Sequence, residues 1–230
     1  MTAEPAPRKI LFLGNSYTGG IVDAFKRALA DSPWHDAEVS FVWAGGATIN
    51  DMIENGRARE ALGQADWDVV ILQEQSLMPA LGGRFEKSFH DAVATLVPEI
   101  REAGAEPILY MTWGRRDGAK RHPERLPDFA TMQQRLSDAY REAARRHDIR
   151  VAPVGEAWAQ VREHDDDLGR ALYQPDGSHP TAHGAYVATC VFFRVLFDAP
   201  LNDLAHPDAL STAEAKQIRQ IVSNMPLASR

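Results

Sequence analysis

The sequence predicts an α/β protein with one domain, built around a mostly parallel sheet of five strands. Among its 230 residues, 44% are hydrophobic and 25% are charged, which is typical of a globular chain with a substantial core. Short apolar or β-branched runs alternate with longer segments of helical periodicity, the pattern of βαβ units. Polar and glycine residues follow the first three runs, as expected where the strands of a parallel sheet meet their ligand.

The five expected strands are short runs rich in Ile, Leu, Val, Phe and Tyr. They are KILFLG (9–14), EVSFVW (38–43), DVVILQ (68–73), PILYMT (107–112) and RVAP (150–153). Between them, apolar residues recur at three- and four-residue spacing with charges interleaved, which predicts helices with one buried face. These helices cover residues 23–30, 49–62, 85–103 and 129–147.

Two further helices are expected near the end of the chain, at residues 181–197 and 212–222. Pro180 stands where proline suits the first turn of the earlier one. No internal repeat or low-complexity tract interrupts the chain, so we expect a single domain over residues 1–230. Residues 1–8 are polar and proline-containing, and we expect them to be flexible.

Charge and cysteine content exclude several classes of function. Lys and Arg total 25 against 32 Asp and Glu, and the net charge of −7 does not supply the basic field of a nucleic-acid-binding protein. The single cysteine, Cys190, lies in an apolar run and is expected to be a buried, inert thiol. The N-terminal segment lacks an apolar run long enough for a signal peptide or membrane span, so we expect a cytoplasmic protein.

The longest expected loop, residues 113–127, is strongly basic. We interpret it first as a solvated surface loop, and the alternative is a lid that attracts anions. Its basic and histidine residues are Arg115, Arg116, Lys120, Arg121, His122 and Arg125.

Two motifs combine into a candidate catalytic site. Ser16, in Gly14-Asn15-Ser16, comes where the first strand turns into a helix, which exposes its hydroxyl on the ligand side of the sheet. Serine needs a base to take its proton, and histidine titrates near neutral pH. His179 lies three residues after Asp176, whose carboxylate can turn back to hold the imidazole. Each motif alone is more often a turn or a cap.

Together, Gly14-Asn15-Ser16, Gly46 after the second strand and Asp176-x-x-His179 resemble the SGNH (GDSL-like) hydrolase superfamily. The resemblance implies a flavodoxin-like three-layer αβα sandwich. It also implies that Ser16 is the nucleophile and that Asp176 and His179 complete the triad. In this family the oxyanion hole is formed by the serine N–H, the glycine of the second block and an asparagine of the third block.

Two departures from the family pattern stand out. Asn15 replaces the usual aspartate before the serine. The third block usually reads Gly-x-Asn-Asp, whereas this chain has Gln73-Glu74-Gln75-Ser76. We assign the oxyanion role to Gln75, with Gln73 as the alternative because period-two spacing puts both on one strand face. Gln73 is then a candidate substrate-binding residue.

The predicted function is that of a serine esterase acting on short acyl or O-acetyl esters, with carbohydrates as candidate carriers. Trp113, after the fourth strand, is a candidate substrate-binding platform, with core packing the equal alternative. We expect a small-molecule ester as the partner, no cofactor and no catalytic metal. The other hypotheses are a non-hydrolytic binding protein on the same scaffold and an acyltransferase that uses the same triad.

Overall fold

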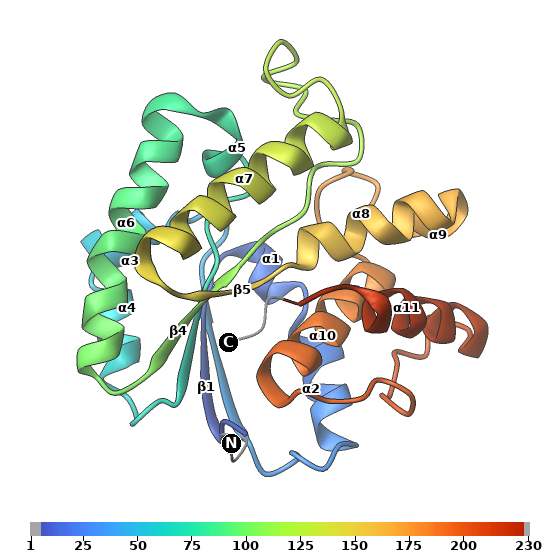
Figure 1. Ribbon diagram of the computed structural model, residues 1–230, viewed down its shortest axis with the longest axis horizontal. Helices are drawn as coiled ribbons and strands as arrows, with labels where there is room; N and C mark the ends of the chain where they lie inside the picture. The colour runs from blue at the N-terminus through green and yellow to red at the C-terminus, as the bar shows by residue number, and fades with distance from the viewer. Residues whose placement is uncertain (1–5, 228–230) are drawn as a thin grey trace.

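The computed structural model describes residues 6–227, which form a five-stranded sheet covered by helices on both faces (Figure 1). The strands are β1 (Lys9–Gly14), β2 (Glu38–Trp43), β3 (Val69–Leu72), β4 (Glu106–Tyr110) and β5 (Arg150–Ala152). All strand pairs in this sheet are parallel, and the order is β2-β1-β3-β4-β5. This is the flavodoxin-like order, so the expected fold class is confirmed.

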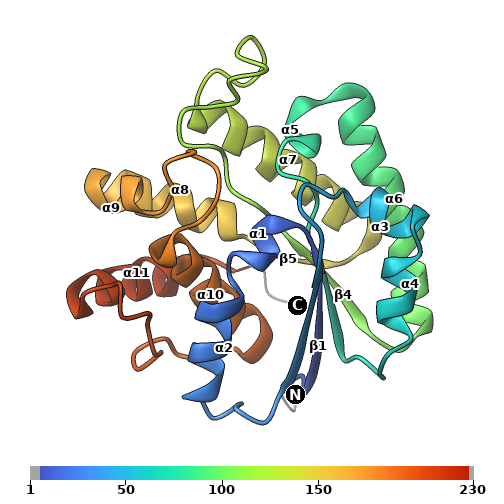
Figure 2. The same cartoon turned by 180° about the vertical axis from the view of Figure 1, so that it is seen from behind.

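Eleven helices occur within residues 6–227. On one face of the sheet are α3 (Ile49–Glu54), α4 (Arg57–Leu62), α5 (Met78–Leu81), α6 (Gly83–Glu102) and α7 (Phe129–His147). On the other are α1 (Ser16–Gly19), α2 (Val22–Ala30), α8 (Val154–His164), α9 (Asp166–Ala171), α10 (Ala182–Phe197) and α11 (Thr212–Asn224). Figure 2 shows α2 beside α10 on that face.

Side chains along each strand point alternately to the two faces of the sheet, and this divides the hydrophobic core into two clusters. In β1, Ile10 and Phe12 face α10, whereas Leu11 and Leu13 face the α3–α7 side. Successive side chains of a strand point to opposite faces, so a fully apolar strand fills both clusters at once. Cys190 is buried in the α10 cluster, as expected, and burial raises the pKa of its thiol to about 12.

The helix expected over residues 49–62 is broken in two. Gly56 has φ +80°, a conformation that favours glycine, and it caps the start of α4. The expected start of α10 is also corrected: Thr181 is its N-cap, so Pro180 lies outside the helix. No bounds were expected for α1, α5, α8 and α9, although a helix was expected to follow the first strand at Ser16. Of these, α8 has a detectable signal, because Val154, Ala157, Trp158 and Val161 follow helical spacing.

The beginning of the described chain, which includes only the last three of the eight residues expected to be flexible, is in contact with the rest of the protein. Residues 1–5 lie outside the described residues. Pro7 is buried, and the backbone N–H of Arg8 donates to Asp68 Oδ2 over 2.7 Å. None of the helices in residues 6–227 has the length and apolarity needed to cross a lipid bilayer.

Candidate active site

Ser16 lies at the turn from β1 into the one-turn helix α1, and Asn15 holds this turn. Asn15 Oδ1 accepts from the N–H of Tyr17 (3.1 Å), and its Nδ2 donates to the Ala47 carbonyl (3.0 Å). Asn15 is 2% exposed. A carboxylate at this position could accept from Tyr17 but could not donate to Ala47. The amide therefore explains why asparagine stands where the common motif has aspartate.

Gln73 lies beneath the same turn, and both the oxygen and the nitrogen of its side-chain amide form hydrogen bonds there. Its Oε1 accepts from the Asn15 N–H (2.9 Å) and from the Thr18 N–H and hydroxyl (3.2 and 2.9 Å). A Cβ at Gly14 would lie 2.5 Å from that Oε1, so this approach requires glycine. The Gln73 Nε2 donates to the Glu74 carbonyl (2.5 Å), and the residue is 1% exposed. Gln73 is therefore a structural residue, and the expectations of a substrate contact or an oxyanion donor there are corrected.

The structure brings the three residues of the expected triad together in one hydrogen-bonded chain. Ser16 Oγ is 2.9 Å from His179 Nε2, and His179 Nδ1 is 2.5 Å from Asp176 Oδ2. The other Asp176 oxygen accepts from the backbone N–H groups of Ser178 (2.9 Å) and His179 (3.0 Å). A proton on Nδ1 facing Asp176 leaves the Nε2 lone pair toward the serine hydroxyl, the arrangement that proton abstraction needs.

The same hydrogen bonds favour the ionised form of Asp176. Partial burial disfavours its charge, but the His179 ring and the two backbone N–H groups outweigh this effect and lower the pKa of the carboxyl below its ordinary value. The site is open, since the Asp176 and His179 side chains are 46% and 38% exposed.

Trp113 lies in the core, where it contacts the loop that carries Asp176 and His179, and it is not exposed to solvent. It stacks between Tyr17 (centroids 4.4 Å apart) and Trp158 (4.0 Å), and its Nε1 donates to the Ser178 carbonyl (2.9 Å). Its exposed fraction is 0%. The expectation that Trp113 contacts substrate is therefore wrong for this structure, and the core alternative holds. The Ser178 hydroxyl pairs with that of Tyr17 (2.7 Å).

Gln75 and Gly46 are placed at the ends of neighbouring loops with free N–H groups. Gln75 Oε1 accepts from the Leu77 N–H (2.7 Å), which fixes the amide, and its Nε2 has no hydrogen-bond partner among residues 6–227. Gly46 has φ +70°, and a Cβ there would meet nothing within 4 Å. Positive φ and the open space both suit a glycine whose N–H faces a ligand.

Glu74 links the segment after β3 to the segment after β2 through hydrogen bonds of its side chain. Its carboxyl oxygens accept from the Gln75 N–H (2.6 Å) and, at longer distance, from the N–H of Ile49 (3.4 Å), the first residue of α3. The side chain is buried, with 1% exposure. Burial raises the pKa of Glu74 from 4.5 to about 8, and these hydrogen bonds only partly offset the effect.

Trp43 is a residue of this edge for which the sequence motifs indicated no role. It pairs with Gly14 in the β1–β2 register, and it is the exposed large hydrophobic residue of the described chain, at 47%. A Cβ at Gly19 would lie 2.6 Å from its ring, which therefore lies against the end of α1, one turn from Ser16. Its position at the end of an expected strand, two residues before Gly45-Gly46, was the available signal.

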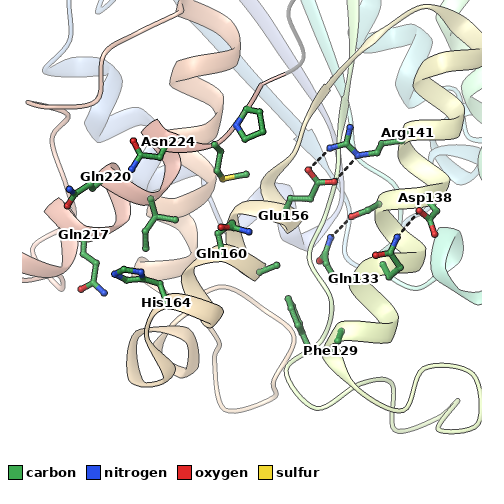
Figure 3. Close-up of a pocket in the computed structure, with 17 residues that line it drawn as sticks. Phe129, Gln133, Asp138, Arg141, Glu156, Gln160, His164, Gln217, Gln220 and Asn224 are labelled. Carbon is green, nitrogen blue, oxygen red and sulfur yellow. Dashed lines mark hydrogen bonds and ion pairs between the residues drawn. The ribbon is translucent and has the colours of Figure 1, made fainter.

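A separate cavity of about 800 Å³ lies between α7, α8 and α11 (Figure 3). Polar side chains line it, among them the ion pair of Arg141 with Glu156. None of the expected site residues takes part in its lining. In residues 6–227 no group of three or more His, Cys, Asp or Glu side chains is arranged to hold a metal ion.

No family model and no curated protein sequence matches the chain. Solved structures do. A DUF4886 family protein from Bacteroides uniformis has a TM-score of 0.74 at 19% identity, over 94% of this chain and 93% of the other. A protein from Slackia heliotrinireducens described as a candidate SGNH hydrolase has a TM-score of 0.65 at 29% identity, over 80% and 96%. An acetylxylan esterase from Geobacillus stearothermophilus has a TM-score of 0.62 at 19% identity, over 83% and 94%.

These structures match the chain over most of their own length and have its α/β architecture. The resemblance that the serine, glycine and Asp-x-x-His motifs indicate is confirmed by them, and the chain has the fold of the SGNH hydrolases.

Proposed function

We propose that this protein is a serine hydrolase that cleaves carboxylic esters through an acyl-enzyme on Ser16. The observation that carries the proposal is the continuous chain from Ser16 Oγ through the His179 ring to Asp176, with links of 2.9 and 2.5 Å. Such a chain lets a neutral imidazole take the serine proton while a carboxylate stabilises the imidazolium that forms.

The reaction proceeds in two displacements. Ser16 Oγ attacks the ester carbonyl carbon as its proton moves to His179 Nε2, and the tetrahedral intermediate then collapses. The bond to the alcohol oxygen breaks, and His179 returns the proton to that oxygen. Water attacks the acyl-serine by the same route, with His179 as base, and releases the carboxylic acid and the free serine.

Three N–H groups are the proposed oxyanion donors: those of Ser16, Gly46 and the Gln75 side chain. None of them donates to another group within residues 6–227. The protein already engages both ends of the Gln73 amide, so Gln75 is the remaining choice for the third block. Glutamine carries the same amide as the asparagine of the family pattern on a longer side chain.

We further propose short acyl or O-acetyl esters as substrates, with carbohydrates as carriers. The open triad admits a bulky alcohol part, and the exposed Trp43 ring beside the end of α1 offers a flat apolar face on which a sugar ring can stack. Trp43 thus takes the role that the sequence had indicated for Trp113. The esterase activity on acetylated xylan in the name of one structural neighbour agrees with this substrate class.

The test is hydrolysis of p-nitrophenyl acetate, butyrate and octanoate by the purified protein and by its Ser16→Ala variant. We expect turnover that depends on Ser16 and falls with chain length. A fluorophosphonate probe adds a covalent readout, because labelling should disappear in both Ser16→Ala and His179→Ala. Equal background rates and no labelling would refute the hydrolase and favour a non-hydrolytic binding protein. Product analysis with alcohol acceptors separates hydrolysis from acyl transfer.

A further inference from the structure

Arg115 is an arginine near the candidate active site that has no acceptor for its side chain. Its Nε is fully buried and unpaired, and its terminal nitrogens have no partner within residues 6–227. Two acidic residues that follow it in the sequence are used elsewhere. Asp117 forms an ion pair with Arg116 (2.9 Å), and Asp128 caps α7 by accepting from Thr131 N–H (2.7 Å).

The backbone next to Arg115 contacts the loop that carries Asp176 and His179. Burial raises the pKa of the Tyr17 hydroxyl, and the positive charge of Arg115 acts on it in the opposite direction. Tyr17 follows Ser16 directly, and its ring centroid is 5.6 Å from that of His179. The residue after Arg115 donates its backbone N–H to the Gly177 carbonyl (2.9 Å), between Asp176 and Ser178.

The base of the basic loop is held against the molecule, which gives Arg115 a defined position. The Arg115 N–H donates to Met132 Sδ (3.3 Å), and its carbonyl accepts from the Gly118 N–H (3.1 Å). Only the more distal part of the loop extends outward, at the top of Figures 1 and 2. Arg115 therefore belongs to the anchored part and is not one more solvated charge of the tip.

A guanidinium in this setting calls for an anion. Nε is closed to a ligand by burial, but the two terminal nitrogens have no acceptor within residues 6–227, and the end of a planar guanidinium matches the two oxygens of a carboxylate. The chain as a whole is acidic, with a net charge of −7, and would repel an anionic substrate. A local positive charge beside the nucleophile reverses that effect where the ester must bind.

We propose that Arg115 binds a carboxylate-like oxyanion carried by the ester substrate, next to the carbonyl that Ser16 attacks. The substrates are then acidic esters, in which either the alcohol part or the acyl part bears the negative charge. This inference rests on the proposed function, because it places the anion on a molecule that Ser16 cleaves. It also narrows the alternative interpretation of the 113–127 loop, a lid that attracts anions, to one residue, Arg115.

The experiment compares kcat/KM for two matched substrate pairs. In the first, 3-acetoxybenzoate and 3-acetoxybenzamide differ by a charge on the alcohol part. In the second, the 4-methylumbelliferyl monoester of adipic acid and its terminal amide differ by a charge on the acyl part. We expect one of the carboxylates to be preferred over its amide by about tenfold to a hundredfold, the range of a hydrogen bond to a charged group. The preferred pair identifies the side of the substrate.

Variants assign the preference to Arg115. The carboxylate-to-amide ratio should fall to about 1 in Arg115→Gln, and this ratio does not depend on the amount of folded enzyme. The matched control is Lys120→Gln, which removes an exposed charge from the same loop and should keep the preference. A preference that survives Arg115→Gln would overturn the inference, as would the absence of any preference in both pairs. If Ser16-dependent hydrolysis of the ester bond occurs but is equally fast for the carboxylate and the amide member of each pair, only this inference fails. If no ester is hydrolysed, the proposed function fails with it.

Discussion

The buried carboxyl of Glu74 makes the stability of this protein depend on pH in an unusual direction. Most native carboxyl groups gain stability when ionised, but burial raises the pKa of Glu74 to about 8. The folded protein therefore holds the Glu74 proton at pH values where the unfolded chain, with an ordinary value of 4.5, has already released it. The contribution of Glu74 is present in full below about pH 4.5 and is lost as pH rises toward 8.

The size of this effect follows from the two pKa values. A difference of one proton bound changes the free energy of unfolding by about 1.4 kcal/mol per pH unit. Between pH 5 and 8 the loss attributable to Glu74 is on the order of 4 kcal/mol, a large share of the 5–15 kcal/mol typical of a domain. Glu74→Gln keeps the shape and one carbonyl acceptor for the Gln75 N–H, but it cannot ionise.

The assay is urea unfolding of the wild type and Glu74→Gln at pH 5, 6, 7 and 8. We expect the free energy of unfolding of the wild type to fall steadily relative to the variant over this range. The comparison cancels other titrating groups, such as His90, whose pKa is lowered by burial. Glu60→Gln, at an exposed site of α4, is the matched control and should run parallel to the wild type. A difference between wild type and Glu74→Gln that does not change with pH would refute the reasoning.

Three further predictions concern the nucleophile turn and the oxyanion donor. Gly14→Ala places a Cβ 2.2 Å from Thr18 Oγ1, so we expect a loss of about 1–3 kcal/mol in urea unfolding together with a loss of esterase activity; unchanged stability would contradict the tight packing. Asn15→Asp cannot donate to the Ala47 carbonyl and should lower the free energy of unfolding by about 1–3 kcal/mol, and a neutral result would show that this hydrogen bond is unimportant. Gln75→Ala should lower kcat on p-nitrophenyl acetate by about 10²–10³ with a smaller change in KM, and an unchanged kcat would remove Gln75 from the oxyanion hole.

Much of the fold follows from local patterns. The bounds expected for β1, β2 and α7 agree with the structure to the residue, because their apolar runs or amphipathic faces end at clear polar or glycine positions. The prediction of one helix over residues 49–62 was wrong, also for a local reason. The apolar spacing continues through Gly56, but the left-handed conformation of that residue interrupts the helix.

The order of motifs along the chain was enough to group Ser16, Asp176 and His179, because the carboxyl ends of parallel strands and the loops that follow them meet at one edge of the sheet. Sequence could not assign roles to the two tryptophans near strand ends, Trp43 and Trp113. Trp43 is 47% exposed and Trp113 is 0% exposed, although both stand in the same kind of position. The difference comes from Trp158 and the Ser178 loop, distant segments that cover Trp113 and leave Trp43 open.

The sequence by itself therefore determined the α/β class, the sheet-edge location of the site and the chemical types of its residues, since these depend on periodicity and on residue chemistry. Only the tertiary structure showed how differently Gln73 and Gln75 are surrounded, although they have the same side chain two residues apart. The first is enclosed beneath the nucleophile turn, with both ends of its amide engaged, whereas the second keeps a free N–H group. Such a difference is set by which remote backbone groups reach each amide, and no local pattern in the chain records it.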